Sequence, residues 1–335
     1  MKFLIAGYGS IGRRHMRNLL ALGQREIVLY RSHRSTLPDD ELQGLPVETS
    51  LEQALSHKPD AVVIANPTAL HLDVAIPTAE MGCHILMEKP ISHSLERIDL
   101  LQQAVERGGG KILVGFQYRF HPGLQKVKSL LEEGAIGRLL SIRVEWGEYL
   151  PGWHPWEDYR QGYSARSDLG GGVVLTLCHP LDYLRWLVGE VEELYASVGR
   201  ISDLEIDVED SAEMLLHFSG GAVGSLHLDY YRRPGVHRIE MTGSNGILAW
   251  DNADGSVKLY RPDTTNWEMY SVPEGFERNT LFMDEMRHFL EVVSGKGSPV
   301  CTLLDGKRAL QLVLAAYRSS AEKCAISGED LYPQG

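Results

Sequence analysis

The feature that most constrains this chain is a glycine-rich turn close to residue 1. Residues 2–6 form a largely apolar run of strand length, and Gly7, Gly9 and Gly12 follow with G-x-G-x-x-G spacing. Gly7 permits a tight turn, Gly9 lets a pyrophosphate approach the backbone, and Gly12 allows a helix to pack closely on the strand. Strand, glycine turn and helix in this order predict a dinucleotide-binding site, and a glycine-rich turn in an ordinary α/β protein is the alternative.

A helical pattern over residues 11–22 follows the turn, with Gly23 as its C-cap. The free N–H groups at a helix N-terminus carry partial positive charge, which attracts phosphates. We therefore expect the backbone at Ser10 and Ile11 to contact the cofactor.

The second strand, residues 26–30, is not followed by the acidic residue that usually accepts the ribose 2′-hydroxyl of NAD. Arg31, Ser32 and Arg34 follow instead. Guanidinium and hydroxyl groups bind a 2′-phosphate that a carboxylate would repel. The sequence therefore favours NADP(H) over NAD(H), and a solvated basic loop that tolerates NAD is the alternative.

A further set of polar residues follows the apolar run at residues 61–65. Asn66, Pro67 and Thr68 come directly after it, and His71 lies in the first turn of the next helical pattern. In α/β folds, ligands bind at the carboxyl ends of the parallel strands. These four residues are therefore expected at the cofactor.

The alternation of strand and helix patterns ends near residue 115, which predicts two domains. We expect a doubly wound parallel α/β domain of the Rossmann type over residues 1–120 and an α+β domain over residues 121–335. Strand-like runs separated by turn signals predict a large open antiparallel sheet in the second domain, with one helix over residues 173–187. The aromatic and polar loop at residues 150–172 has a length that is usually functional.

Composition excludes several classes of protein. The chain has 335 residues and a net charge of −12, which disfavours binding to nucleic acid or to an anionic membrane surface. No stretch is apolar enough to span a bilayer. Four scattered cysteines and the lack of a secretory pattern fit a reducing cytoplasm and predict no thiolate metal site. We expect no bound metal.

The tripeptide Glu88-Lys89-Pro90 follows the fifth predicted strand directly. With the glycine turn, the triplet at residues 66–68, the glycines at residues 170–172 and His179, it makes the chain resemble the Gfo/Idh/MocA oxidoreductases over essentially its whole length. The resemblance implies a Rossmann domain, a C-terminal open-sheet domain and NAD(P)-dependent hydride transfer at a hydroxyl or keto carbon of a sugar or polyol. The loop at residues 153–156 also resembles relatives of nucleotide-sugar metabolism.

In this family Lys89 matches the catalytic lysine, and His179 matches the histidine that hydrogen-bonds the reacting hydroxyl. Glu88 and Lys89 are also expected beside the cofactor. An ammonium at a strand end can polarise a carbonyl, and burial is expected to lower the pKa of Lys89 into a useful range. A solvated loop lysine and a satisfied core histidine are the alternatives.

Thr176 departs from the family pattern, which usually has an aspartate one turn before the histidine. A threonine cannot supply the negative charge that raises the pKa of a neighbouring histidine. Asp182 shares a face of the predicted helix with His179 and is expected either to orient it or to cap and pack the helix. The departure leaves two other functions open: a cofactor-binding sensor or partner subunit without redox turnover, and an NAD-assisted lyase or glycosidase.

Arg119, Tyr163 and Arg166 join Thr176 and Asp182 as candidates for substrate contact near the domain junction. A structural salt bridge or a surface position is the alternative for the two arginines and Tyr163.

The predicted sheet has a second face to cover, which another subunit covers in similar proteins. We therefore expect a homodimer or homotetramer formed through the C-terminal sheet, with a small sugar-like substrate.

Overall fold

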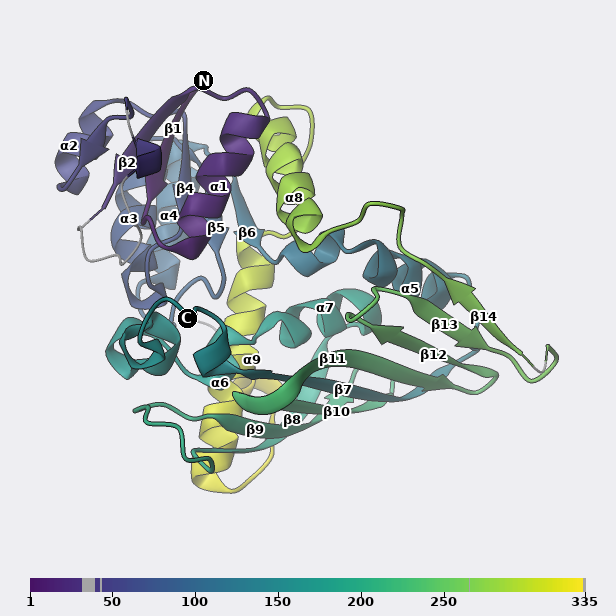
Figure 1. Ribbon diagram of the computed structural model, residues 1–335. Helices are drawn as coiled ribbons and strands as arrows, with labels where there is room; N and C mark the ends of the chain where they lie inside the picture. Colours follow the sequence, from purple (N-terminus) through teal and green to yellow (C-terminus); the bar gives the residue numbers. More distant parts are fainter. Residues whose placement is uncertain (32–39, 43, 265, 334–335) are drawn as a thin grey trace.

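The computed structural model describes residues 1–31, 40–42, 44–264 and 266–333. The chain forms two lobes, each built on one β-sheet, and the second sheet lies below the first in Figure 1. Every helix in the described part of the chain is too short or too polar to cross a lipid bilayer.

The N-terminal lobe contains a six-stranded parallel sheet in the order β3-β2-β1-β4-β5-β6. Its central strands are buried, which their nearly continuous apolar sequences require. The strands are β1 (Lys2–Ala6), β2 (Glu26–Tyr30), β3 (Val47–Glu48), β4 (Ala61–Ile64), β5 (His84–Glu88) and β6 (Ile112–Gly115). This strand order confirms the predicted doubly wound Rossmann fold.

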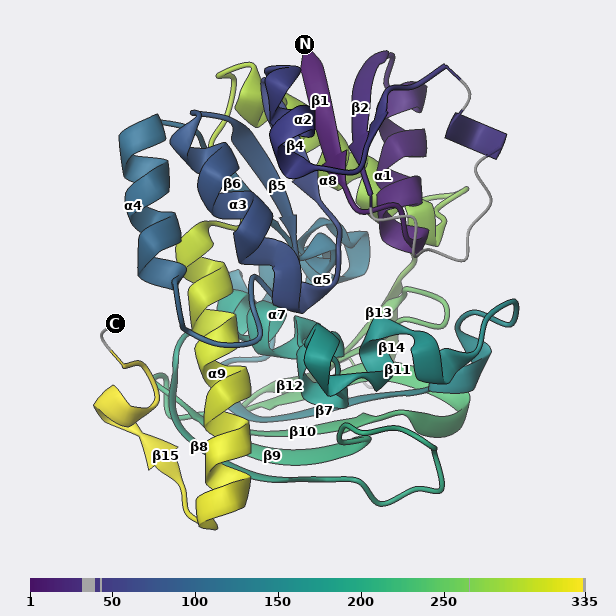
Figure 2. The same cartoon turned by 90° about the vertical axis from the view of Figure 1, so that its left-hand side faces the viewer.

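Helices cover both faces of this sheet. α1 (Ser10–Ala21) and α8 (Arg278–Val293) lie side by side on one face, and α3 (His71–Glu80) and α4 (Ile98–Gly108) pack on each other on the opposite face (Figure 1 and Figure 2). α2 (Leu51–Ser56) contacts β2 and β3. Because α8 comes from late in the chain, the C-terminal half completes the N-terminal lobe.

The second lobe contains a nine-stranded sheet in the order β14-β13-β12-β11-β7-β10-β9-β8-β15. The strands are β7 (Leu139–Tyr149), β8 (Val191–Gly199), β9 (Ser211–Phe218), β10 (Val223–Asp229), β11 (Tyr231–Gly243), β12 (Gly246–Asp251), β13 (Val257–Tyr260), β14 (Trp267–Tyr270) and β15 (Ile326–Ser327). All neighbouring strands are antiparallel except β7 and β10, which are parallel. The sheet is therefore mixed rather than purely antiparallel, because a long crossover leads from β7 to β8, and β9 and β10 then return by antiparallel pairing to the side of β7.

The two faces of this second sheet differ in burial. In β9 the buried Ala212, Met214 and Leu216 alternate with the exposed Glu213 and Leu215. Helices on the inner face cover the buried set, while the outer residues face solvent. The helices of this lobe are α5 (Pro122–Glu132), α6 (Val173–Thr176), α7 (His179–Val188) and α9 (Leu303–Glu322).

The helix expected over residues 173–187 is broken between α6 and α7, at residues 177–178. Pro180 explains the break. It has no N–H to donate to the carbonyl four residues earlier, that of Thr176, and its ring would clash with that carbonyl in a continuous helix. The prediction of a single helix is therefore wrong.

A buried ion pair holds the segment η3 (Gln117–Phe120) against α7. Arg119 donates from Nε and a terminal nitrogen to the two oxygens of Asp182 at 2.9 and 2.7 Å, and to the Val300 carbonyl at 2.6 Å. Burial raises the pKa of Asp182 although Arg119 acts to lower it, so desolvation offsets much of the attraction. Both residues were candidates for substrate contact, and Asp182 also for orienting His179. In the structure their polar groups bind each other, which fits the structural salt bridge that the sequence left open for Arg119.

Replacing Arg119 with methionine should cost about 3 to 5 kcal/mol of unfolding free energy, because Asp182 would be left buried without its partner. Urea unfolding followed by circular dichroism measures this change. Arg287→Met is a matched control, because Arg287 pairs with Asp284 where the two side chains are 54% and 41% exposed. The control should cost about 0 to 1 kcal/mol. Equal losses in the two variants would contradict the structural assignment.

Candidate active site

The glycine turn between β1 and α1 has the geometry that its sequence indicates. Gly7 has a φ of +99°, and a Cβ there would lie 2.6 Å from the backbone nitrogen of Asn66. A Cβ on Gly12 would lie 2.1 Å from the Gly7 carbonyl oxygen. Both positions therefore exclude a side chain. A Cβ on Gly9 would meet no atom within 4 Å, so the backbone there borders open space.

The first turn of α1 offers N–H groups to this open space. Gly9 is the N-cap and has no side chain that could accept a hydrogen bond, and the first turn contains no acidic residue. Ser10 and Ile11 are the first residues after this cap. A diphosphate fits this end of the helix, because it would meet backbone donors and the positive end of the helix dipole. The glycine turn and these two residues therefore suit a dinucleotide cofactor.

Arg31 lies at the end of β2. Its guanidinium carbon is 5.2 Å from the centroid of the Tyr8 ring, and the residue is 5% exposed. Ser32 and Arg34, the other two residues expected at a 2′-phosphate, lie outside the described residues. The described end of β2 therefore contributes one cation to the region where the adenine ribose is expected.

His71 joins the loops that follow β4 and β5. Its Nδ1 lies 2.9 Å from the carbonyl oxygen of Pro90, and its Nε2 lies 3.0 Å from that of Asn66. Burial lowers the pKa of His71 to about 4, so the neutral ring donates to one of these carbonyls at a time. The triplet Asn66–Thr68, expected at the cofactor, is thereby held beside the loop that carries Lys89.

Glu88, also expected at the cofactor, has its carboxylate directed to α1. Its Oε1 lies 2.7 Å from Nε2 of His15, which is fully buried. The backbone N–H of Lys89 donates to the other oxygen at 3.4 Å. The carboxylate of Glu88 is therefore held by His15 of α1 and in turn accepts a hydrogen bond from the backbone of Lys89.

Lys89 reaches from the first lobe to the second. Its ammonium donates to the backbone carbonyl of Thr176 at 2.6 Å. That carbonyl is left out of helical hydrogen bonding because Pro180 cannot donate to it. The break between α6 and α7 therefore supplies the acceptor for Lys89.

The surroundings of Lys89 keep it protonated. Burial acts to lower the pKa of Lys89, but the neighbouring Tyr163, Cys178 and Glu88 together outweigh it, and the pKa is raised. The expected net lowering of this pKa is therefore wrong, because the expectation considered burial and left out these neighbours. Lys89 is a cation at neutral pH and serves as a hydrogen-bond donor. Tyr163, a candidate for substrate contact, lies within electrostatic range of it.

His179 begins α7 inside a cluster of aromatic rings. Phe116 and Tyr118 meet it edge-on with ring centroids 5.5 and 5.0 Å away, and Trp146 is tilted against it at 5.6 Å. The residue is 3% exposed, and its Nδ1 has no hydrogen-bond partner in the described structure. Burial, together with the charge of Lys89, lowers the pKa of His179 well below its ordinary value. The imidazole is therefore neutral at neutral pH and can accept a proton.

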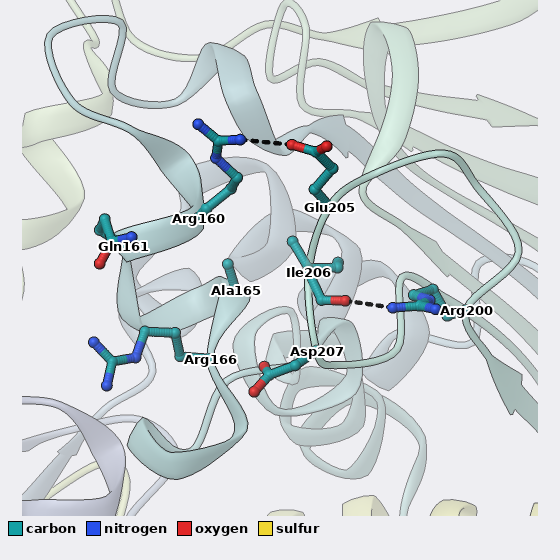
Figure 3. Close-up of a pocket in the computed structure, with 8 residues that line it drawn as sticks. All are labelled: Arg160, Gln161, Ala165, Arg166, Arg200, Glu205, Ile206 and Asp207. Carbon is teal, nitrogen blue, oxygen red and sulfur yellow. Dashed lines mark hydrogen bonds and ion pairs between the residues drawn. The ribbon is translucent and has the colours of Figure 1, made fainter.

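Arg166 makes its ion pair elsewhere. It pairs with Asp168 at 2.6 Å and lines a cavity of about 420 Å³ between two loops of the second lobe (Figure 3). Arg160 and Arg200 line the same cavity, and Figure 3 shows the three guanidinium groups pointing in different directions. Arg160 pairs with Glu205 at 2.6 Å. This arrangement fits the surface position that the sequence left open for Arg166.

A second cavity, of about 400 Å³, lies between the ends of β7 and β12 and residues 235–237 of β11, and it was not anticipated from the sequence. His237 on its wall stacks on Trp146 with ring centroids 4.1 Å apart. Trp146 in turn contacts His179, so the aromatic cluster connects this cavity with the catalytic candidates. The polar and aromatic residues that line the cavity are Glu148, Tyr149, Trp153, His237, Asp251 and Asn252.

Comparison with known proteins agrees with this arrangement. The chain is 28% identical over 351 residues to the myo-inositol 2-dehydrogenase of Thermotoga maritima, with 99% of each chain covered. It is 24% identical to the D-xylose 1-dehydrogenase (NADP(+)) 2 of Haloferax volcanii, over 96% of this chain and 97% of that one. Among solved structures, levoglucosan dehydrogenase in complex with NADH has the same fold, with a TM-score of 0.85, 21% identity and 98% of both chains covered.

Two family descriptions match the two lobes. Residues 1–116 match "Oxidoreductase family, NAD-binding Rossmann fold", and residues 124–249 match "GFO/IDH/MocA C-terminal domain". Because these matches span most of the chain, this protein belongs to the GFO/IDH/MocA family of oxidoreductases.

Proposed function

We propose that this protein transfers hydride between a nicotinamide dinucleotide and a hydroxyl or keto carbon of a sugar or polyol. The observation that carries the proposal is the placement of a cationic Lys89 and a neutral His179 where the two lobes meet. The glycine turn that suits the dinucleotide lies at the carboxyl edge of the same parallel sheet. Donor and proton acceptor are thus available on the substrate side of the cofactor site.

His179 and Lys89 have different roles at the reacting oxygen of the substrate. A bound nicotinamide ring would supply the hydride acceptor. During alcohol oxidation, the imidazole of His179 takes the hydroxyl proton, and Nζ of Lys89 donates a hydrogen bond to the same oxygen as negative charge develops. During ketone reduction, His179 returns the proton. The aromatic rings around His179 exclude water and so favour its neutral form before each oxidation.

The cavity beside the aromatic cluster supports a substrate with several hydroxyl groups. Glu148, Asp251 and Asn252 provide hydrogen-bond acceptors, and Trp153 provides an aromatic face. Two carboxylates in the lining would repel a phosphate, which favours a neutral polyol or sugar over a nucleotide-linked one. Relatives named for myo-inositol and D-xylose support the same class.

The assembly and location of the protein are also proposed. Tyr195 and Leu215 are cross-strand neighbours on the outer face of the second sheet and are 44% and 55% exposed. We infer that a second copy covers this face and gives a homodimer or homotetramer. A monomer by light scattering at micromolar concentration would contradict this assembly.

All four cysteines are free thiols, which suits the reducing cytoplasm.

For the cofactor, NADP(H) should bind more tightly than NAD(H), because Arg31 follows β2 where an NAD-preferring site has a carboxylate. Arg31→Met should weaken NADP+ binding by about 10- to 100-fold, since a hydrogen bond to a charged group contributes about 1.5 to 3 kcal/mol. The variant should leave NAD+ affinity near that of the wild type. Isothermal titration with both cofactors measures this. Equal affinities of the wild type for the two cofactors would exclude the preference.

For catalysis, Lys89→Ala and His179→Ala should each lower kcat by about 10²- to 10⁴-fold, because each removes a positioned donor or proton acceptor. Cofactor affinity should stay near the wild-type value, because the glycine turn contacts the dinucleotide separately. Turnover on a panel of polyols and sugars, with titration of the cofactor, measures both effects. The exposed Lys296→Ala is the control. Wild-type turnover in Lys89→Ala would overturn the assignment, and cofactor binding without any turnover in the wild type would favour a sensor.

A pH–rate profile tests the role of the uncharged residue 176. Thr176→Asp would place a carboxylate one turn before His179, which stabilises the imidazolium and raises its pKa. In the wild type this pKa lies well below the ordinary value, so alcohol oxidation should keep its rate as the pH falls. In Thr176→Asp the acid limb of kcat/KM should move to higher pH, whereas the neutral Thr176→Asn should leave it in place. Identical acid limbs in all three proteins would show that His179 is not the proton acceptor.

A further inference from the structure

A buried cluster of side chains next to the Lys89 backbone contains two carboxyl groups, and the hydrogen bonds of the described structure satisfy only one of them. Glu285 on α8 is 0% exposed, and neither of its carboxylate oxygens has a hydrogen-bond partner in the described chain. Side-chain atoms of His15, Glu88 and Glu285 all lie within 4.8 Å of one another. The cluster therefore joins α1, β5 and α8, and two carboxyl groups share one small, buried space.

An unpaired carboxylate in such a space is costly, so a proton or a cation must neutralise it. His15 does not satisfy Glu285 by a direct hydrogen bond. Its Nε2 is bound to Glu88, and its Nδ1 is buried without a partner in the described structure.

A divalent metal is also disfavoured, because the positive charges of Arg14 and Lys89 already act on Glu88. Arg14 lies 4.5 Å from the centre of the Phe282 ring, which is edge-on to His15 at 6.1 Å. The charge of Arg14 acts on Glu88, and Lys89 follows Glu88 directly in the chain. A proton is the neutralising species that adds no further positive ion to this environment.

We propose that Glu285 is protonated in the folded protein and hydrogen-bonds to Glu88, which makes it a positioning residue for Lys89. Glu88 then receives three donors: the His15 ring, the backbone N–H of Lys89 and the Glu285 hydroxyl. Burial and the adjacent Glu88 carboxylate both raise the pKa of Glu285, in agreement with this arrangement.

The consequence for Lys89 follows from its position in the chain. The carboxylate of Glu88 is fixed on one side of the Lys89 backbone, and the ammonium is fixed on the other side by the Thr176 carbonyl. Without the third donor, Glu88 can turn within the cluster and displace the backbone of Lys89. This effect on turnover rests on the proposed function, whereas the protonation of Glu285 does not.

Infrared difference spectroscopy tests the protonation directly. The wild-type protein at pH 7 should show the C=O stretch of a neutral carboxyl group, and Glu285→Gln should lose that band. Asp284→Asn is the matched control, because it removes the preceding acid on the same helix, whose side chain is 41% exposed. The control should keep the band. A wild-type spectrum without the band, a band that survives in Glu285→Gln, or a stoichiometric bound metal by elemental analysis would each overturn the proposal.

Kinetics then test the positioning role. Glu285→Leu fills the space without a donor and should lower kcat by about 10- to 100-fold through displacement of Lys89, with cofactor affinity unchanged. Glu285→Gln retains an N–H donor and should recover most of that loss. Wild-type kcat in a folded Glu285→Leu would exclude the positioning role. If the wild type shows no turnover at all, the proposed function fails, while the infrared band still decides whether Glu285 is protonated.

Discussion

The arrangement of the site depends on the hydrogen bond between the Lys89 ammonium and the Thr176 carbonyl. This bond joins the two lobes and exists because Pro180 releases the carbonyl from the helix. A backbone carbonyl gives Lys89 an acceptor without placing a full negative charge beside His179. The histidine therefore stays neutral in its aromatic surroundings. Thr176 in place of the family's usual aspartate is thus compatible with proton transfer by His179.

Burial destabilises the charged forms of the other acids at the junction of the lobes. Each of these acids is stabilised in a different way. Asp182 is held by two hydrogen bonds from Arg119, and Glu88 by His15 and a backbone N–H. Glu285, in our proposal, keeps its proton. The Arg119–Asp182 pair holds η3 against α7, whereas the contacts of Glu88 also fix the backbone of Lys89, so these contacts offset the cost of burying each acid.

Local features of the sequence determined the cofactor half of the protein. The spacing of Gly7, Gly9 and Gly12 already implied the excluded Cβ positions and the open backbone, because those constraints arise between residues that are adjacent in the chain or in neighbouring strands. The alternation of strands and helices likewise determined the parallel sheet. The break before His179 was available from the sequence as well, because the effect of Pro180 on a helix is local.

Only the tertiary structure decided the charges and partners at the site, because these depend on residues far apart in the chain. The sequence left substrate contact and a structural salt bridge both open for Arg119, and only folding pairs it with Asp182. The sign of the Lys89 pKa shift likewise depended on neighbours from the other lobe. The parallel pairing of β7 and β10 also required the complete chain path. Glu285 carried no motif signal, since an acid on an amphipathic helix is distinguished here only by its burial and its distance from Glu88.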